Sequence, residues 1–296
     1  MTTYQRDIVI CILAALATAA VVGYFLGNLD KQKTAEPTDL FGLAPHTPDA
    51  WLVVERPAVF ARMMLSKPEI RALFATYIPA VYLTLMEEQP ELKKVLFSFH
   101  KQGVVMYARA DESMAYRIDK EILSPAFNAY SPERRTEGKI TFIYYPVATD
   151  RFFGCYQYKD VFAASFSRKL LEGVAERQQL PCIPASQWMQ QAATDGLQAP
   201  VSLLIPARSL NLYVLANDSS EWRIRDTWLT ADLFPREGRL CAIGTQPYHA
   251  VLDTFYQPMA DTLSVRLEKA FPGVRFQTKA DVGNEWVYFT VCSDQP

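Results

Sequence analysis

The sequence has few of the residues from which enzyme sites are usually built. It contains only three histidines, His46, His100 and His249, although histidine is the usual general base and a common metal ligand. It also lacks a Gly-x-Ser-x-Gly elbow, a glycine-rich phosphate loop and a His-Glu-x-x-His zinc motif. We therefore assign no catalytic residue, no metal site and no cofactor, and favour a binding protein over an enzyme.

The chain also lacks an excess of charge of either sign. Its 30 Lys and Arg residues nearly balance its 32 Asp and Glu residues, for a net charge of −2. Because nucleic-acid binders usually carry a strong basic excess, no nucleic-acid partner is expected. Half of the 296 residues are hydrophobic and 12% are aromatic, which excludes a disordered or fibrous chain.

One long uncharged run stands near the N-terminus. Residues 8–26 read IVICILAALATAAVVGYFL, with Arg6 and Asp7 before them and Lys31 after them. As a helix this run is about 28 Å long, close to the hydrocarbon thickness of a bilayer. We predict that residues 1–27 form a transmembrane anchor in contact with the lipid bilayer through residues 8–26. A cleaved signal peptide is the alternative, because Ala17-Thr18-Ala19 has the form of a cleavage site.

The orientation of this anchor follows from the layout of the chain, because the positive charges on its two sides are nearly equal in number. A short tail, one span and about 270 further residues are typical of a signal anchor with its bulk exported. We therefore expect a single-pass protein of a bacterial inner membrane with its soluble domain in the periplasm.

The cysteines of the soluble part agree with export. Cys155, Cys182, Cys241 and Cys292 are an even set, which suits an oxidising compartment, although free buried cysteines are an equal alternative. If Cys241 and Cys292 lie on neighbouring strands, their Cα atoms should be within about 7 Å of each other, the reach of a disulfide.

The soluble part reads as an α+β fold, with mixed or antiparallel sheet and segregated helices. Residues 28–48 are a stalk, residues 49–180 a first α+β half, residues 181–199 a linker and residues 200–296 a second half. Runs rich in β-branched and aromatic residues predict strands. These strands are residues 50–55, 103–110, 139–147, 151–158, 160–167, 201–210, two within 228–245, and 285–293. Apolar spacing and proline positions predict helices from Pro57, over residues 68–77, after Pro79, over 167–178 with Ser167 as the cap, and over 249–269.

Both halves open with the same pattern, in which an apolar strand is followed by Pro-Ala. This pattern is WLVVERPAVF at residues 51–60 and VSLLIPARSL at residues 201–210. Later strand pairs align only at a different offset, at Pro146 and Pro235. The different offset is explained if the two halves are related and the second has a shortened middle. Chance similarity explains it equally.

Three stretches carry a resemblance at the level of fold patterns. They are Thr47-Pro48-Asp49-Ala50 through Phe60, Phe162-Ala163-Ala164-Ser165 through Val174, and Trp228 through Gly244. With its short anchor, the chain resembles a group of single-span, extracytoplasmic bacterial membrane proteins, many of them from the Bacteroidota. The resemblance implies a location and an architecture, and it brings no catalytic residues.

Two reactive pairs are suggested by spacing alone. Ser98 and Lys101 have the Ser-x-x-Lys spacing of penicillin-binding enzymes, but the Lys-Thr-Gly partner of that family is absent. Cys241 and His249 could meet as a nucleophile and base, although a buried thiol in a strand is the commoner outcome. We assign catalysis to neither pair.

Two further clusters could bind a ligand. Arg134-Arg135 could hold a carboxylate or phosphate, or belong to a solvated loop. The aromatic stripe, which comprises Phe142, Tyr144, Phe152, Tyr156 and Tyr158, could line a groove for a lipid or peptide. More often such alternation is one face of a sheet packed on helices.

Together these features favour a membrane-anchored, extracytoplasmic binding or interaction module of the cell envelope, with an envelope protein as a candidate partner. An envelope hydrolase with a site assembled from scattered residues is one alternative. A carrier of lipids or envelope precursors is the other, and it predicts a large apolar cavity beneath the aromatic stripe.

Overall fold

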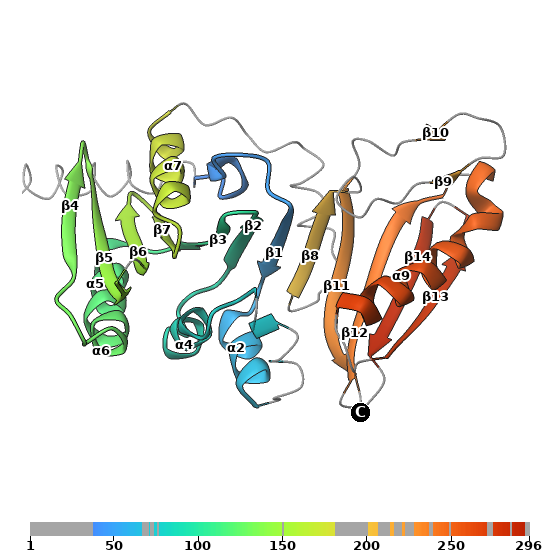
Figure 1. Cartoon of the computed structure of the whole chain (residues 1–296), viewed down its shortest axis with the longest axis horizontal. Helices are drawn as coiled ribbons and strands as arrows, with labels where there is room; N and C mark the ends of the chain where they lie inside the picture. The colour runs from blue at the N-terminus through green and yellow to red at the C-terminus, as the bar shows by residue number, and fades with distance from the viewer. Residues whose placement is uncertain are drawn as a thin grey trace, which may run out of the picture. The chain divides into compact units, whose positions relative to one another are not determined.

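The computed structural model of the chain (Figure 1) describes residues 38–296 apart from several gaps. The gaps are residues 67–70, 72–73, 76, 150, 181–200, 207–213, 216–220, 223–227, 237–238, 249, 271–274, 285 and 294–296. The anchor at residues 8–26, the first part of the stalk (residues 28–37), the linker at 181–199 and Cys182 therefore lie outside the described residues. Among the residues that are described, no helix has both the length and the hydrophobicity to cross a membrane.

The strands confirm the α+β class, because one large antiparallel sheet is combined with separate helices. The first half contributes β1 (Ala50–Val54), β2 (Val95–His100), β3 (Gly103–Arg109), β4 (Glu133–Glu137), β5 (Ile140–Ala148), β6 (Arg151–Tyr158) and β7 (Val161–Ser165). The second half contributes β8 (Val201–Pro206), β11 (Trp228–Arg236), β12 (Arg239–Pro247), β13 (Phe276–Val282) and β14 (Trp286–Ser293). A separate short pair is formed by β9 (Val214–Leu215) and β10 (Glu221–Trp222).

The 12 strands of the sheet follow the order β13-β14-β12-β11-β8-β1-β2-β3-β7-β6-β5-β4. The sheet therefore continues across the predicted boundary between the halves, where β1 pairs with β8 in antiparallel register and Leu52 lies opposite Leu203. Short hairpins join β2 to β3, β5 to β6 and β6 to β7, which explains why these neighbours in sequence are also neighbours in space.

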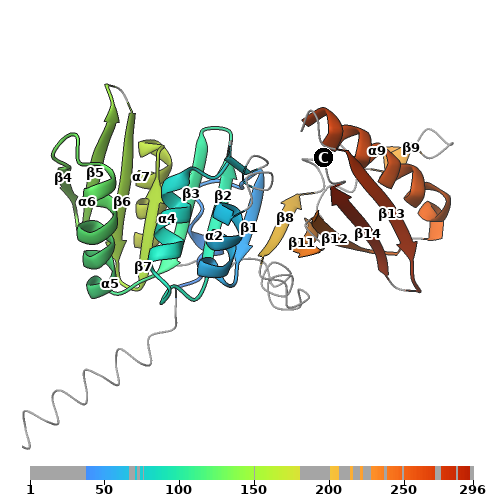
Figure 2. The same ribbon diagram turned by 90° about the horizontal axis from the view of Figure 1, so that it is seen from below.

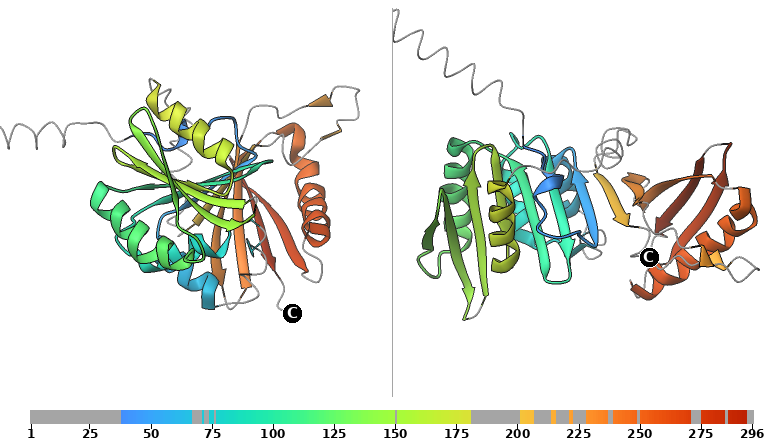
Figure 3. Two further views of the ribbon diagram at one scale, coloured as in Figure 1. Left: turned by 60° about the vertical axis from the view of Figure 1, so that its left-hand side comes forward. Right: turned by 90° about the horizontal axis from the view of Figure 1, so that it is seen from above.

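Helices cover both faces of the sheet in the first half (Figures 1 and 2). On one face lie α2 (Pro57–Ser66), α4 (Ala80–Glu88), and a continuous run of α5 (Glu112–Arg117), the π-helical η2 (Ile118–Leu123) and α6 (Ser124–Ala126). On the other face lie η1 (Phe41–Leu43) and α7 (Arg168–Gln179), as Figure 3 shows. In the second half, η4 (Ala250–Phe255) leads into α9 (Tyr256–Ala270).

Each face of the first half has its own core. The core under α2 and α4 includes Phe60, Met64 and Tyr82, all at most 1% exposed. The core under α7 and η1 includes Trp51 and Tyr107, which are also at most 1% exposed. Because side chains alternate along a strand, one strand such as β1 supplies both cores: Leu52 points to the first and Trp51 to the second.

Both edges of the sheet are protected against pairing with another strand. The edge strand β4 has the sequence ERRTE, and its charges oppose association. The edge strand β13 is capped by side chains of α9. Gln257 Oε1 accepts a hydrogen bond from the Ala280 N–H at 3.1 Å, and Glu268 Oε1 accepts one from the Phe276 N–H at 3.3 Å.

Most predicted elements are present within a few residues of their predicted bounds. Ser167 caps α7 as predicted, because its Oγ accepts a hydrogen bond from the Leu170 N–H at 3.4 Å. The strands β2, β4, β9, β10 and β13 and the helical run from Glu112 to Ala126 were not predicted from the sequence. The expected loop around Arg134-Arg135 is wrong, because these residues form the middle of β4.

Candidate functional site

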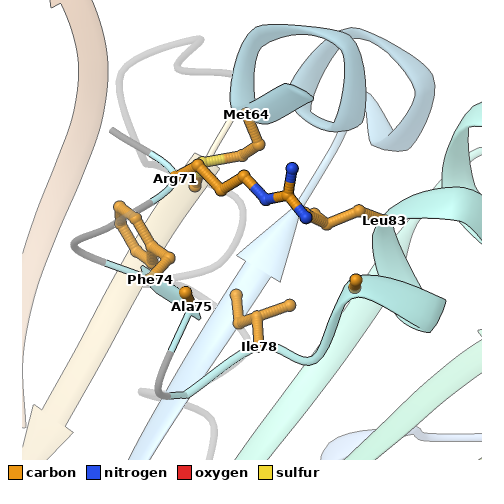
Figure 4. Close-up of a pocket in the computed structure, with 7 residues that line it drawn as sticks. Met64, Arg71, Phe74, Ala75, Ile78 and Leu83 are labelled. Atoms are coloured by element: carbon orange, nitrogen blue, oxygen red, sulfur yellow. The ribbon is translucent and has the colours of Figure 1, made fainter. Parts of the chain in front are cut away.

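A pocket lies between α2 and α4 (Figure 4). Its cavity volume is about 130 Å³. Met64 enters it from α2, Leu83 enters it from α4, and the segment between these helices completes the walls with Phe74, Ala75 and Ile78. Met64 and Ile78 are at most 1% exposed. The pocket is therefore an opening into the apolar core beneath these two helices.

One charged side chain, that of Arg71, lies among these walls. Figure 4 shows it reaching across the pocket between Met64 and Leu83. Within the described part of the chain, Arg71 forms no hydrogen bond or ion pair. A guanidinium group presents several donors in one plane, so it can bind a carboxylate or phosphate through two parallel hydrogen bonds. The pocket thus combines apolar walls with an available cation.

A second cluster contains a serine and a histidine that contact each other. His100 Nε2 and Ser98 Oγ are 2.9 Å apart, and Ser98 Oγ lies 2.9 Å from the hydroxyl of Tyr107. Burial lowers the pKa of His100, and His46 lowers it further, while Asp49 opposes the shift. The imidazole is consequently neutral near pH 7, as a general base must be.

The burial of this cluster limits its chemistry. Ser98 is 0% exposed and Tyr107 is 0% exposed, so the hydroxyl of Ser98 has no route to a substrate. Lys101 lies in the exposed turn between β2 and β3, beyond the end of the strand that carries Ser98. The serine therefore bonds to the buried Tyr107 and the half-buried His100, and the Ser-x-x-Lys spacing is part of a strand and its turn. The indole N–H of Trp51, opposite Ser98 on β1, has no partner among the described residues.

A third cluster surrounds Asp119 in the π-helical turn η2. Asp119 is 5% exposed. Its carboxylate accepts hydrogen bonds from the hydroxyl of Tyr145, from Arg134 Nη2 at 2.7 Å and from Ser124 Oγ at 3.3 Å. Burial raises the pKa of Asp119, but the hydrogen bonds from Tyr145 and Arg134 outweigh burial and lower it overall. Because every partner comes from this chain, the cluster fastens η2 to β4 and β5.

Both arginines of the pair Arg134-Arg135 form ion pairs with carboxylates of this chain. Arg134 binds Asp119, while Arg135 forms an ion pair with Glu137 at 2.7 Å and approaches Glu172 at 4.0 Å. Adjacent residues of a strand point to opposite faces, which explains why the two arginines have different partners.

Cys241 and Cys292 form a disulfide, whereas Cys155 is a free cysteine. Cys241 lies directly opposite Cys292 on β12 and β14, and the two form a disulfide with a Cα–Cα distance of 4.2 Å. The predicted proximity is confirmed, and a Cys241 nucleophile is excluded because its sulfur is bonded. His249 lies outside the described residues. Cys155 is free and buried, and burial raises the pKa of its thiol well above the usual range.

The aromatic stripe is mostly part of the core beneath α7. Phe142, Tyr144 and Tyr156 are at most 3% exposed, and the rings of Phe142 and Tyr156 meet edge to face at 5.4 Å. The Tyr156 hydroxyl donates to Gln178 of α7 at 2.9 Å. Phe152, at the end of the stripe, is 37% exposed. The expectation of a sheet face packed on a helix is therefore confirmed for the buried rings.

Arg71, the Ser98–His100 contact and the Asp119 cluster were not predicted from the sequence. Recognition of residues 95–100 as a strand would have placed Ser98 and His100 on one face, because they are two residues apart. No comparable signal pointed to Arg71, since its pocket forms only when α2 and α4 pack together.

Comparison with known proteins adds little to this description. No protein-family model and no curated protein matches the chain. The structure of TP0453 in crystal form I matches this chain with 9% sequence identity and a TM-score of 0.49. The match covers 86% of this chain and 93% of that chain. The structure in crystal form IV matches with 10% sequence identity and a TM-score of 0.46, and the match covers 88% of this chain and 94% of that chain. This likeness concerns the path of the backbone alone.

Proposed function

We propose that this protein is a membrane-anchored, extracytoplasmic binding module of the bacterial cell envelope, and that the pocket between α2 and α4 is its binding site. The observation that carries the proposal is the combination of apolar walls with the available guanidinium of Arg71. Small-molecule sites typically join a mostly apolar lining to a few polar groups that orient the ligand. The volume of about 130 Å³ suits a small ligand or one group of a larger ligand.

The proposed location depends on two features that are far apart in the sequence. Residues 8–26 are long and apolar enough to serve as the anchor in the lipid bilayer. The disulfide between Cys241 and Cys292 supports an oxidising compartment such as the periplasm, because disulfides rarely persist in the cytosol. The resemblance to single-span extracytoplasmic proteins of the Bacteroidota agrees with this placement.

We also propose that the two halves of the fold are related. The strand order β1-β2-β3-β7-β6 in the first half is matched by β8-β11-β12-β14-β13 in the second, and helices follow the third strand in each case. This correspondence aligns β11 and β12 with β2 and β3. Among the described residues, the first half then has α2, α4, β4, β5 and α7 in addition.

A hydrolase is the second candidate function, and the contact between Ser98 and His100 is the observation in its favour. The complete burial of Ser98 weighs against it. A fluorophosphonate probe tests this alternative directly, because it reacts with an activated serine hydroxyl. Labelling of the full chain that is lost in Ser98→Ala would establish the hydrolase and overturn the binding module.

The location is tested by protease protection in bacteria that express the full chain. In spheroplasts, added protease should degrade the domain, while unprocessed protein should migrate near 33.5 kDa before digestion. Protection of the domain until the inner membrane is permeabilised would place it in the cytoplasm and overturn the proposed location. A known cytoplasmic protein serves as the control, because it resists the added protease as long as the inner membrane is intact.

A further inference from the structure

The charge and the size of the α2–α4 pocket together restrict the ligand. Arg71 is the single charged side chain in its described lining, and the other lining residues include Met64, Phe74, Ile78 and Leu83. One guanidinium neutralises one negative charge and can hold the two oxygens of a carboxylate side by side. Arg71 is exposed, so the second charge of a phosphate would be left to the solvent, and the single guanidinium matches a singly charged group best. The arrangement therefore favours a monoanion.

The apolar part of the ligand is restricted by the volume. A cavity of about 150 Å³ lined by apolar side chains can hold a benzene molecule, and this pocket has about 130 Å³. Met64 and Ile78 form walls that are already buried, so a small apolar group that enters between them exchanges water for apolar contacts. A ring or a short branched chain fits this space, whereas a long acyl chain exceeds it.

We propose that the pocket binds an organic carboxylate, with an apolar group of about the size of a benzene ring between Met64, Ile78 and Leu83 and the carboxylate on Arg71. This inference rests on the proposed function, since it names the ligand class of the same site. Arg71 supplies selectivity for the anion, and the apolar walls supply affinity for the attached group.

The test uses the full chain in lipid nanodiscs, with methionine methyl groups labelled for NMR. The chain has 8 methionines, and the Met64 signal is assigned by its loss in Met64→Leu. Benzoate is the anionic probe and benzyl alcohol the neutral probe of nearly equal shape. We expect benzoate to shift the Met64 signal with a dissociation constant of about 1 mM, typical of a ligand of this size.

Arg71→Gln should weaken benzoate binding about tenfold or more, because it removes a charge-assisted interaction. It should leave the binding of benzyl alcohol unchanged. Arg62→Gln is the matched control, since Arg62 is an exposed arginine of α2 that does not line the pocket. This control should bind both probes as the wild type does.

The outcomes separate this inference from the proposed function. If benzyl alcohol shifts Met64 and benzoate binds no better, or if Arg71→Gln binds benzoate like Arg62→Gln, the pocket binds ligands but the carboxylate inference is overturned. If neither probe shifts Met64 up to about 20 mM, well above the affinity expected for ligands of this size, the pocket is not a binding site and both proposals are overturned.

Discussion

The disulfide between Cys241 and Cys292 should contribute a large share of the stability of the fold. The two cysteines are 51 residues apart in the sequence and directly opposite on β12 and β14. Closing a loop of that length in the denatured chain removes about 14 cal/mol/K of entropy, which corresponds to about 4 kcal/mol at 25 °C. The strands already bring the two Cα atoms to 4.2 Å, so bond formation requires little movement of the backbone. Reduction should therefore lower the free energy of unfolding by up to about 4 kcal/mol.

Urea unfolding of the full chain in detergent, followed by tryptophan fluorescence, measures this difference with and without a reductant. The chain has 5 tryptophans as reporters. The double variant Cys241→Ala/Cys292→Ala is the matched control, because its unfolding should not respond to the reductant. Mass spectrometry of a tryptic digest checks that the two cysteines are joined before reduction. Oxidised and reduced proteins whose unfolding free energies agree within about 1 kcal/mol would refute the loop-closure reasoning.

Three further changes probe the charge cluster, the core and the sheet edge. Asp119→Asn should lower the free energy of unfolding by about 2 kcal/mol at pH 7, because it removes the charge of a buried carboxylate that binds the half-exposed Arg134 and the hydroxyl of Tyr145. The lowered pKa of Asp119 stabilises the fold above its unfolded pKa of about 4, and this contribution is lost as the pH falls through the folded pKa. The difference between variant and wild type in urea titrations should therefore shrink at pH 3, and an equal difference at both pH values would contradict this. Gly154→Ala should cost about 1–3 kcal/mol in the same assay at pH 7, since its Cβ would lie 2.8 Å from Leu171 Cδ2, and wild-type stability would contradict this packing. Gln257→Ala should speed amide hydrogen exchange at Ala280 about five- to tenfold by removing its capping hydrogen bond, and unchanged exchange would show that the cap is not needed.

The strands that were predicted correctly share a local signal. β5 reads ITFIYYPVA and β6 reads RFFGCYQY, and such runs of β-branched and aromatic residues favour extended backbone wherever they occur. Their pairing as a hairpin also follows from the short connection between them. Here local preference and the final structure agree, so the sequence was sufficient.

The strands that were missed lack that signal for physical reasons. β4 is almost entirely charged, and β13 alternates polar and apolar residues, because both strands lie at an edge of the sheet and face water on at least one side. β2 is apolar, but it ends at Ser98 and His100, whose polarity resembles that of a loop. These residues are tolerated in a strand because they bond to each other and because Ser98 also bonds to Tyr107 on β3.

The candidate site could be predicted less well than the fold. Asp119 and Arg134 are 15 residues apart, and only the packing of η2 against β4 brings them to 2.7 Å. Arg71 belongs to a segment whose apolar residues predicted a helix, and nothing in that pattern marked the arginine. A pocket depends on the space left between elements after packing, and that space has no periodic signature in the sequence.

The sequence by itself determined the α+β class, most of the strands and the Ser167 cap of α7, because those depend on side chains that act on their own backbone or its near neighbours. Tertiary structure alone decided that β1 pairs with β8, that Cys241 meets Cys292, and that Arg71 lies over an apolar pocket. Each of these joins parts of the chain through register and packing, which depend on all the elements that surround them.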